Sequence, residues 1–518
     1  MRIEDHLRQS AGRFGSKTAL IAGETRLTYA DLDTLSDQLA AGLVARGIKA
    51  GDRVLMVAEN SAEAVVVFFA AWKAGAVPCP LYASIKQDKL RVIADSTVPF
   101  AVFTQSRSCS VVDAAFGNSD NPPLKISLGG LAEKLPEGWL SYEAMVAHQG
   151  KPELPRQTSG ETLALLIHTS GSTGTPKGVM HSHASLLTAC SSIIDYLGNS
   201  ADDIALSVLP ISFGYGITQI VTMVMVGGTL VLERSFAFPR KTLQRLAEVK
   251  ATVFPIVPPM AALIAGMQDL QPGFLPDLRV VTSAAAAMPP SVGQKLRDLL
   301  PDARLFLMYG QTECIRATYL PPEEAGRRPL SVGRAIPGTR AFVVDENGHT
   351  LGTGEIGELV IEGQHVMSGY WDDPMSSAAK LLPVTDGRRR LHTGDLFRTD
   401  EDGFLYFISR RDDIIKTRGE KVSPQEVERV LYSLPGIREA AVAGIDDPVF
   451  GQLIRAYVAL EPGAGLSEKD ILRHCAVHLE DYMVPKSVEF RDALPKTSTG
   501  KIRLTAEQPA PDIEDNVA

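Results

Sequence analysis

A chain of 518 residues with 45% hydrophobic content can bury a large core, and we expect it to divide into at least two domains. Its net charge of −9 favours neither nucleic acid nor an anionic membrane as a partner. Five scattered cysteines without a CxxC pair argue against a disulfide framework or a zinc site and fit a cytoplasmic location. The N-terminal Met1–His6 is acidic rather than apolar, which is not typical of a signal peptide.

The first part of the chain alternates between helical and strand patterns. Apolar residues at helical spacing predict helices over 27–45 and 62–74, and short apolar runs predict strands over 52–58 and 77–81. Alternation of this kind is typical of an α/β fold in which helices cover both faces of a parallel sheet.

A loop rich in small and hydroxyl residues follows a predicted buried strand over 162–167. Its glycines allow backbone N–H groups to converge on an anion, and its hydroxyls and lysine add donors and charge. It differs from the common P-loop, because Pro176 stands where that motif needs a Gly-Lys pair. The alternative is an ordinary flexible surface loop. The residues expected to hold phosphates are Thr169, Ser170, Gly171, Ser172, Thr173, Gly174 and Lys177.

An uncharged stretch over 204–232 is long enough to cross a membrane. Pro210 and four glycines interrupt it, so we expect a strand, a loop, a buried helix and a strand, and no membrane span. Strand patterns resume over 252–256, 279–282 and 305–308. Because ligands of open parallel sheets bind beyond the carboxyl ends of the strands, the loops at those ends are expected to share one site.

The pattern of predicted secondary structure changes beyond Pro329. Short strands predicted over 341–348 and 357–363 indicate a smaller β-rich subdomain. A separate α/β pattern begins near Arg411. The expected organisation is an N-terminal domain over 1–411 with its β-rich part at about 330–408, a C-terminal domain over 412–505, and a disordered tail over 506–518.

Three short motifs carry further chemistry. Tyr309–Glu313 follows a buried strand, and its threonine and glutamate suit Mg²⁺, which takes few protein oxygens and keeps several waters. His392–Asp395 places a carboxylate after a turn, where it could accept hydrogen bonds from ribose hydroxyls. Leu494–Lys501 ends in a lysine that could stabilise charge in a transition state, although an exposed basic turn would look the same.

These motifs, the 168–180 loop and the charged run Arg410–Lys416 occur in the order and spacing of one superfamily. From Leu27 to Arg503 the chain closely resembles the AMP-forming adenylating enzymes, which include acyl- and aryl-CoA synthetases, adenylation domains and firefly luciferase. It is most similar to a class I carboxylic acid–CoA ligase. The resemblance implies a large N-terminal domain of stacked, mostly parallel sheets and a small mobile α+β C-terminal domain.

The resemblance also implies a two-step reaction and a role for each motif. A carboxylate attacks the α-phosphate of ATP and releases pyrophosphate, and a thiol then displaces AMP from the acyl-adenylate. Residues 169–177 would hold the β- and γ-phosphates, Glu313 the Mg²⁺ and Thr312 the α-phosphate, while Lys501 would bridge the carboxylate and the α-phosphate. The other nucleotide contacts would come from Tyr309, Gly310, Ala285 and Ala286 near adenine, Asp395 at the ribose, and Arg410 at the ribose and phosphate side.

A swinging C-terminal domain is part of the same resemblance. Asp412 stands at the hinge position of the superfamily, and the face that carries Lys416 and Gly419 would turn inward for the second step. Gly419 matches a glycine of the thiol tunnel, where a side chain would obstruct the pantetheine arm.

The acid is less well defined by the sequence. Its pocket would be lined by Phe213, Gly214, Tyr215, Ser283 and Ala284. Gly214 stands where amino-acid adenylating domains have an aspartate, which argues against an amino acid. Phe213–Ile217 is similar to a stretch of benzoate-type CoA ligases, and Tyr215 either faces an aryl ring or packs in the core. The alanines of 284–287 replace glycine and proline that are frequent in the superfamily, and would narrow the pocket or the adenine slot.

The expected function is therefore the ATP- and Mg²⁺-dependent ligation of an aryl or fatty acid to coenzyme A. One alternative is a stand-alone acyl-AMP ligase that loads the thiol of an acyl carrier protein. Another is a non-catalytic nucleotide-binding scaffold, against which Lys177, Glu313, Asp395 and Lys501 argue. The resemblance also allows a dimer.

Overall fold

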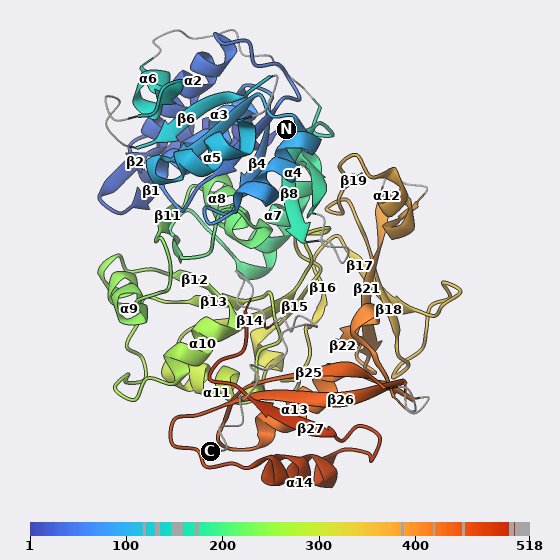
Figure 1. Ribbon diagram of the computed structural model, residues 1–518. Coiled ribbons are helices and arrows are strands. Elements are labelled where there is room, and N and C mark those ends of the chain that lie inside the picture. The colour runs from blue at the N-terminus through green and yellow to red at the C-terminus, as the bar shows by residue number, and fades with distance from the viewer. Residues whose placement is uncertain are drawn as a thin grey trace, which may run out of the picture. The chain divides into compact units, whose positions relative to one another are not determined.

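The computed structural model describes residues 1–117, 121–129, 135–147, 159–170, 176–384, 388–417, 420–447, 451–496 and 502 (Figure 1). The chain forms two compact units. Unit 1 contains Met1–Phe342 and Val360–Thr393, and unit 2 contains Val343–Leu359 and Gly394–Ala518. Parallel sheets in unit 1 and a β-containing C-terminal region confirm the predicted α/β fold class. Within the described ranges, no helix combines the length and apolarity needed to cross a membrane.

A nine-stranded sheet runs through unit 1 in the order β16-β15-β14-β13-β12-β10-β11-β1-β2. The strands from β14 to β1 in that order are parallel, so β13 and β14 present their carboxyl ends at one edge. The bounds are β1 (Thr18–Ala22), β2 (Thr25–Thr28), β10 (Ile204–Ser207), β11 (Thr229–Leu232), β12 (Val253–Ile256), β13 (Val280–Ser283), β14 (Arg304–Tyr309), β15 (Thr318–Leu320) and β16 (Arg334–Ala335).

A second sheet of unit 1 has the order β4-β3-β5-β6-β7 and is entirely parallel. Helix α3 (Ala62–Lys73) is buried on all sides, which explains why its sequence is apolar around the whole helix, including Phe68 and Trp72. The strands are β3 (Arg53–Val57), β4 (Val77–Leu81), β5 (Ala101–Gln105), β6 (Leu124–Leu128) and β7 (Trp139–Ser141).

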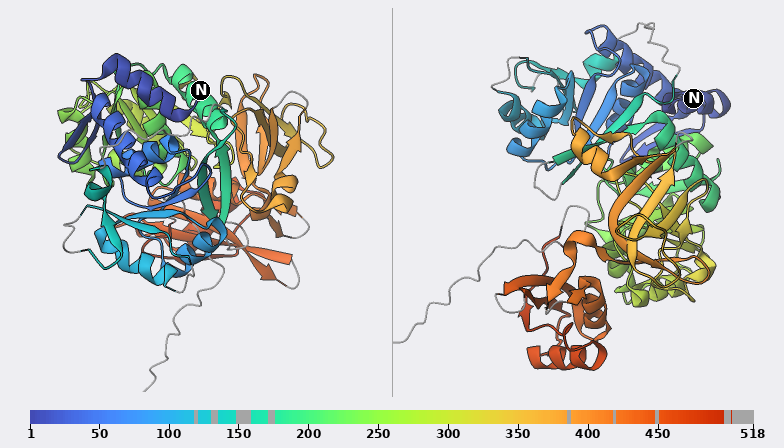
Figure 2. Two further views of the ribbon diagram at one scale, coloured as in Figure 1. Left: turned by 90° about the horizontal axis from the view of Figure 1, so that it is seen from above. Right: turned by 90° about the vertical axis from the view of Figure 1, so that its right-hand side faces the viewer.

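The other helices of unit 1 flank its sheets (Figure 2). Helix α8 (Gly214–Val226) lies between β10 and β11 in sequence and is largely buried, so the uncharged stretch is a strand, a buried helix and a strand as predicted. The remaining helices are α1 (Ile3–Phe14), α2 (Tyr29–Val44), α4 (Gln87–Thr97), α5 (Cys109–Phe116), α6 (Tyr142–Val146), α7 (His183–Leu197), α9 (Pro239–Glu248), α10 (Pro258–Ala265), α11 (Pro290–Leu299) and α12 (Pro374–Lys380).

A three-stranded antiparallel sheet joins β8 (Leu163–Ser170), β9 (Pro176–Ser182) and β19 (Gly369–Tyr370) in the order β19-β9-β8. Here the sequence-based prediction was wrong, because it placed Thr169, Ser170 and Lys177 in a loop at the end of a parallel strand. In the structure Thr169 faces Lys177 across a hairpin. Antiparallel pairing satisfies backbone N–H and C=O groups that a loop would leave to water.

The strands predicted over 341–348 and 357–363 are present as β17 (Arg340–Val344) and β18 (Gly357–Gly363). They belong to a sheet of order β17-β18-β21-β20, with β22 paired to β21. Its other strands are β20 (Leu381–Pro383), β21 (Arg389–Thr399) and β22 (Leu405–Arg410).

The C-terminal part of unit 2 has its own apolar core, which includes Val427, Leu431 and Ile454. Its sheet has the order β24-β23-β26-β25, with β27 paired to β26, and helices α13 (Pro424–Ser433) and α14 (Glu468–His478) accompany it. The strands are β23 (Ile415–Thr417), β24 (Glu420–Val422), β25 (Ile437–Asp447), β26 (Gly451–Leu460) and β27 (Ser487–Phe490).

Candidate active site

The Tyr309–Glu313 motif leaves the carboxyl end of β14 through a tight turn. A Cβ atom on Gly310 would lie 2.8 Å from the carbonyl oxygen of Ile315 and 2.9 Å from the Cα of Arg316, so the turn requires glycine there. Ile315 has a φ of 59°, a left-handed conformation that is rare for a β-branched residue. Backbone strain of this kind is often held at functional sites.

A buried histidine of β9 fixes the position of Thr312. The Nε2 atom of His181 lies 2.7 Å from the carbonyl oxygen of Thr312. Because a carbonyl only accepts, Nε2 must carry the proton. Burial lowers the pKa of His181 to about 4, so the ring is neutral at physiological pH. The strand that follows the predicted phosphate loop therefore also positions the residue expected at the α-phosphate.

Glu313 is linked to Lys177 through Tyr370 of β19. The Tyr370 hydroxyl donates a hydrogen bond of 2.8 Å to Oε1 of Glu313. The Nζ atom of Lys177 lies 5.3 Å from the centroid of the Tyr370 ring. Burial and the neighbouring Glu313 raise the pKa of Tyr370, so its hydroxyl stays protonated and donates. A cation, an aromatic ring and a carboxylate from three segments are thus in contact.

Lys177 is also held by the start of α12. Its Nζ donates to Oγ of Ser376 at 2.6 Å and lies 3.6 Å from Oδ2 of Asp373. Hydrogen bonds from Ser376 and the charge of Lys177 hold the pKa of Asp373 below its usual range. Tyr370, Asp373 and Ser376 were not identified from the sequence. The Asp-Pro-x-Ser pattern signals a helix start, and nothing in it indicates a functional site.

The strands around the phosphate loop approach each other closely at Gly178. A Cβ atom there would lie 2.9 Å from Cδ1 of Leu166 and 3.1 Å from Cβ of Trp371. Next to it, the Thr169 hydroxyl lies 3.5 Å from the carbonyl oxygen of Lys177. The predicted phosphate contacts Gly171, Ser172, Thr173 and Gly174, and the side chain of Ser170, lie outside the described residues.

The loop after β13 contains an alanine in a backbone conformation that is usual for glycine. Ala285 has a φ of 79°, in the left-handed region that glycine favours. Ser283 and Ala284 before it are buried, whereas Ala286 is exposed. Ala285 therefore holds local backbone strain in the loop that is predicted to form the adenine slot.

Three residues predicted to line the acid pocket, Phe213, Gly214 and Tyr215, contact three different segments. Tyr215 is bonded through its hydroxyl to Thr282, with 3.0 Å to the carbonyl oxygen and 2.7 Å to Oγ1. Gly214 lies against Ile315, whose Cδ1 would be 3.1 Å from a Cβ atom on this glycine. The ring of Phe213 packs edge-on against Tyr82 at a centroid distance of 4.5 Å.

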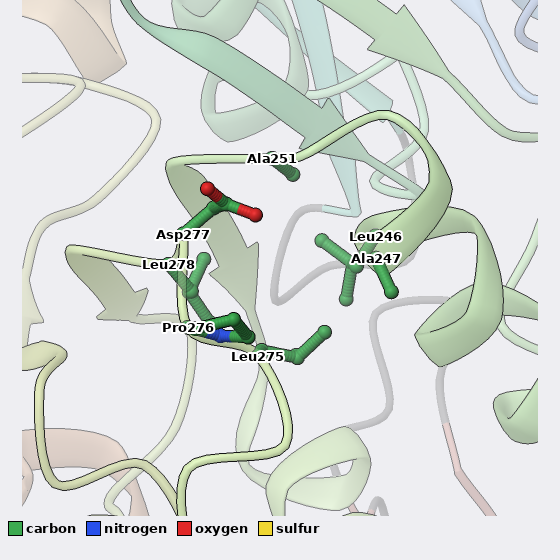
Figure 3. A pocket seen from close by; sticks show the side chains of 7 residues that line it. All are labelled: Leu246, Ala247, Ala251, Leu275, Pro276, Asp277 and Leu278. Carbon is green, nitrogen blue, oxygen red and sulfur yellow. The ribbon is translucent and has the colours of Figure 1, made fainter.

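Two of the hollows in the described part of unit 1 differ in position. The larger, of about 330 Å³, borders the loop before α8 and is lined in part by Tyr82, Pro210 and Ser212. The smaller, of about 110 Å³, is apolar apart from Asp277 and lies where the chain enters β12 and β13 (Figure 3). These are the amino ends of the strands, so the smaller hollow lies at the opposite edge from the Tyr309–Glu313 motif.

In unit 2, Asp395 and Arg410 face each other on β21 and β22. The Nε atom of Arg410 lies 3.7 Å from Oδ1 of Asp395, which is 4% exposed. The prediction that Asp395 follows a turn was wrong, because Asp395 and the residues before it belong to strand β21. Within this strand Gly394 adopts a positive φ of 75°. Lys416 lies on β23 with an exposed side chain. Lys501, Gly419 and the side chain of Asp412 lie outside the described residues.

The residues present fit a magnesium ion held mainly by substrate. In the part of the chain that the structure describes, no three His, Cys, Asp or Glu side chains gather as a metal site. Glu313 is half-buried and oriented by Tyr370. Mg²⁺ is commonly bound through one or two carboxylates together with substrate phosphates, which a single oriented glutamate can provide.

Comparisons with known proteins agree along nearly the whole chain. The family described as AMP-binding enzyme matches residues 7–371, and the AMP-binding enzyme C-terminal domain matches 426–501. The chain is 31% identical to an indoleacetate–CoA ligase of Aromatoleum aromaticum, covering 97% of each chain. It is also 31% identical to a long-chain-fatty-acid–CoA ligase of Bacillus subtilis, covering 98% of this chain and 94% of that one. The crystal structure of ATP-bound MatB from Rhodopseudomonas palustris superposes with a TM-score of 0.87 at 27% identity over 97% of each chain.

Proposed function

We propose, from the premise that this chain belongs to the AMP-binding enzyme family and is an ATP-dependent, AMP-forming acid–thiol ligase, that it joins an aryl or fatty acid to coenzyme A. The observation that carries the proposal is the contact of Lys177, Tyr370 and Glu313 beside Thr312. This set offers a cation for phosphate oxygens and an oriented carboxylate for a metal. The relatives named for an aryl-substituted and a long-chain acid support both acid classes.

In the first half-reaction an oxygen of the acid attacks the α-phosphorus of ATP, and the bond to the leaving pyrophosphate breaks. Lys177 and the hydroxyls of residues 169–173 hold the β- and γ-phosphates, and Thr312 contacts the α-phosphate. Lys501 holds the attacking carboxylate against the α-phosphate. Bringing two anions together needs charge neutralisation and positioning above all. Mg²⁺, which Glu313 would hold, neutralises part of the triphosphate charge when bound.

In the second half-reaction the thiol sulfur of coenzyme A attacks the acyl carbon, and AMP leaves. Asp395 and Arg410 hold the ribose. The C-terminal domain over 412–505 turns about Asp412, and its face with Lys416 and Gly419 shapes the thiol tunnel. Asp412 lies inside unit 2, so the pivot that we propose is not the boundary between the two compact units.

The products of a panel of acids test this function. The chain is supplied with ATP, Mg²⁺ and indoleacetate, benzoates or fatty acids of several lengths, with and without coenzyme A. We expect AMP and pyrophosphate, and acyl-CoA whenever coenzyme A is present. Pyrophosphate release without acyl-CoA would favour an acyl carrier protein as the acceptor. Failure of every acid to release pyrophosphate would contradict the proposal.

A further inference from the structure

Arg316 is a buried cation that forms no ion pair with any carboxylate in the described ranges. It follows Glu313 by three positions and is 2% exposed, and its Nε atom has no hydrogen-bond partner. Two other arginines of the described chain are similarly buried. Arg2 pairs with Glu4 at 3.0 Å, and Arg328 pairs with Glu324. Arg316 therefore departs from the way this protein neutralises its other buried guanidinium groups.

Arg316 lies against aromatic and polar side chains. Its Cζ lies 4.9 Å from the centroid of the Tyr215 ring. The Tyr196 hydroxyl also lies nearby, and its own hydrogen bond goes to Sδ of Met308 at 3.1 Å. Tyr215 in turn is bonded to Thr282, and the next residue, Ser283, has a buried Oγ without a partner. Two unused buried donors, from Arg316 and Ser283, thus lie on segments that meet at Tyr215.

This arrangement is unfavourable unless an anion completes it. A guanidinium taken out of water loses its hydration, and stacking on an aromatic ring restores only part of that loss. The guanidinium is a planar fork of N–H donors that matches both oxygens of a carboxylate. Since no carboxylate of the described chain is paired with it, we look for that group on the ligand.

We propose that Arg316 binds a second carboxylate of the substrate, remote from the carboxyl group that is adenylated. This inference rests on the proposed function, because Tyr215 and Ser283 are among the residues proposed to line the acid pocket. It narrows the substrate to a dicarboxylic acid, with an aryl or aliphatic body packed against Tyr215. Arg316 is then a residue that determines specificity, and Ser283 supplies an additional hydroxyl in the same pocket.

Matched acids test the proposal. The pair 4-carboxybenzoate and 4-nitrobenzoate has similar shape and differs in the remote charge, and hexanedioate and hexanoate form an aliphatic pair. With at least one of these pairs, we expect the wild-type kcat/KM for pyrophosphate release to be about 100-fold or more higher for the dicarboxylic acid. Arg316→Met removes that advantage and leaves the neutral acid within a few-fold. Arg316→Lys, which keeps the charge without the fork, restores part of it.

A control and a second measurement separate binding from a structural role. Arg304→Met is the control. It removes a guanidinium from the first residue of β14, which donates to the carbonyl oxygen of Leu197 at 3.1 Å, and this variant should keep the preference for the dicarboxylic acid. Without acid, Arg316→Met should unfold at the same temperature as the wild type or higher, because an unpaired buried charge has been removed. If that variant does not fold, the wild type alone decides: the preferred dicarboxylic acid should raise its unfolding temperature more than the neutral partner does.

The outcomes distinguish this inference from the function on which it rests. Equal use of charged and neutral acids by the wild type, or an equal loss for both in Arg316→Met, would overturn the role of Arg316 while the ligase function stands. Absence of pyrophosphate release with every acid, together with no acid-dependent change in unfolding temperature, would overturn both.

Discussion

Tyr370 joins the two charged residues of the candidate site, since its hydroxyl bonds Glu313 and its ring lies beside Lys177. Tyr370→Phe keeps the ring and removes the hydrogen bond to the carboxylate. A hydrogen bond to a charged group contributes about 1.5–3 kcal/mol, so we expect kcat/KM for ATP to fall by roughly 10- to 100-fold. Steady-state pyrophosphate release at several Mg²⁺ concentrations measures the change.

A hydroxyl elsewhere in the chain serves as the control. The hydroxyl of Tyr432 on α13 donates to the carbonyl oxygen of Ala440 at 3.2 Å and accepts from its N–H group at 3.0 Å. Neither residue is among those of the candidate site. Tyr432→Phe should leave kcat/KM unchanged. If Tyr370→Phe behaves like Tyr432→Phe, the hydroxyl does not orient Glu313 for catalysis.

Ala285 gives a prediction about stability. A left-handed backbone costs a residue with a Cβ about 1 kcal/mol, and Ala285→Gly removes that cost while adding freedom to the unfolded chain. We expect its free energy of unfolding to stay within about 0.5 kcal/mol of the wild type or to rise. Ala286→Gly, at a position without positive φ, should lose up to about 1 kcal/mol. Urea unfolding compares the two, and equal losses would show that the loop is not strained.

Strand β9 connects several parts of the candidate site. It carries Lys177 at its start and His181 near its end, and it pairs with β8 on one side and β19 on the other. The position of one strand therefore sets the lysine, the carbonyl of Thr312 and the ring of Tyr370 together.

The packing of β9 can be tested at Gly178. A methyl group there would meet Leu166 and Trp371 at distances tighter than ordinary contact, so Gly178→Ala should destabilise unit 1 by about 1–3 kcal/mol. At Gly12, inside α1, no atom lies within 4 Å of the position that a methyl group would take, and Gly12→Ala should instead stabilise by about 0.5–1 kcal/mol. Calorimetric unfolding midpoints should therefore move in opposite directions, and a shared direction would contradict this packing.

His181 makes stability depend on pH. Its pKa falls from 6.5 to about 4 on folding, so between these values the unfolded chain binds more protons than the folded one. Stability should be fully present above about pH 6.5 and decrease as the pH is lowered toward 4, by about 3 kcal/mol from His181 alone. Burial lowers the pKa of four further histidines in the same direction: His6, His168, His183 and His365.

Replacement of His181 isolates its contribution to the pH dependence of stability. Glutamine can donate to the carbonyl oxygen of Thr312 but does not titrate, so His181→Gln should flatten the decline in unfolding temperature between pH 6.5 and 4. His349→Gln, which replaces a histidine whose side chain is 81% exposed, should leave the decline unchanged. An unchanged pH profile in His181→Gln would show that His181 is not buried as a neutral ring.

The sequence predicted the elements of this region better than their partners. Apolar periodicity reports local burial, and it located α2, α3, β3 and β4 to within two residues. The pairing of β9 with β19 joins Val179 to Tyr370, and no local pattern encodes a contact between segments so far apart. For the same reason Tyr370, Ser376 and His181 could not be identified as partners of Lys177 and Thr312.

At the scale of the whole molecule, ordered motifs were more informative than composition. Composition indicated only a large globular protein, whereas the order of the 168–180 loop, Tyr309–Glu313 and the C-terminal lysine loop indicated the family that the comparisons then showed. The specific acid was not predicted, because the pocket that we propose for it depends on contacts between distant segments, such as Arg316 on Tyr215 and Ile315 on Gly214.

We assign the two half-reactions to different residues of one chain, and Lys501 is the residue on which that division depends most. Its control is Lys496→Ala, since Lys496 pairs with Glu439 at 2.5 Å and has no proposed role in either step. The decisive measurement compares Lys501→Ala with the wild type in both half-reactions separately. We predict that acyl-AMP formation falls by about 10²- to 10³-fold, while thioester formation from supplied acyl-AMP stays within about two-fold of the wild type. An equal loss in both half-reactions, or no loss in the first, would contradict this role of Lys501.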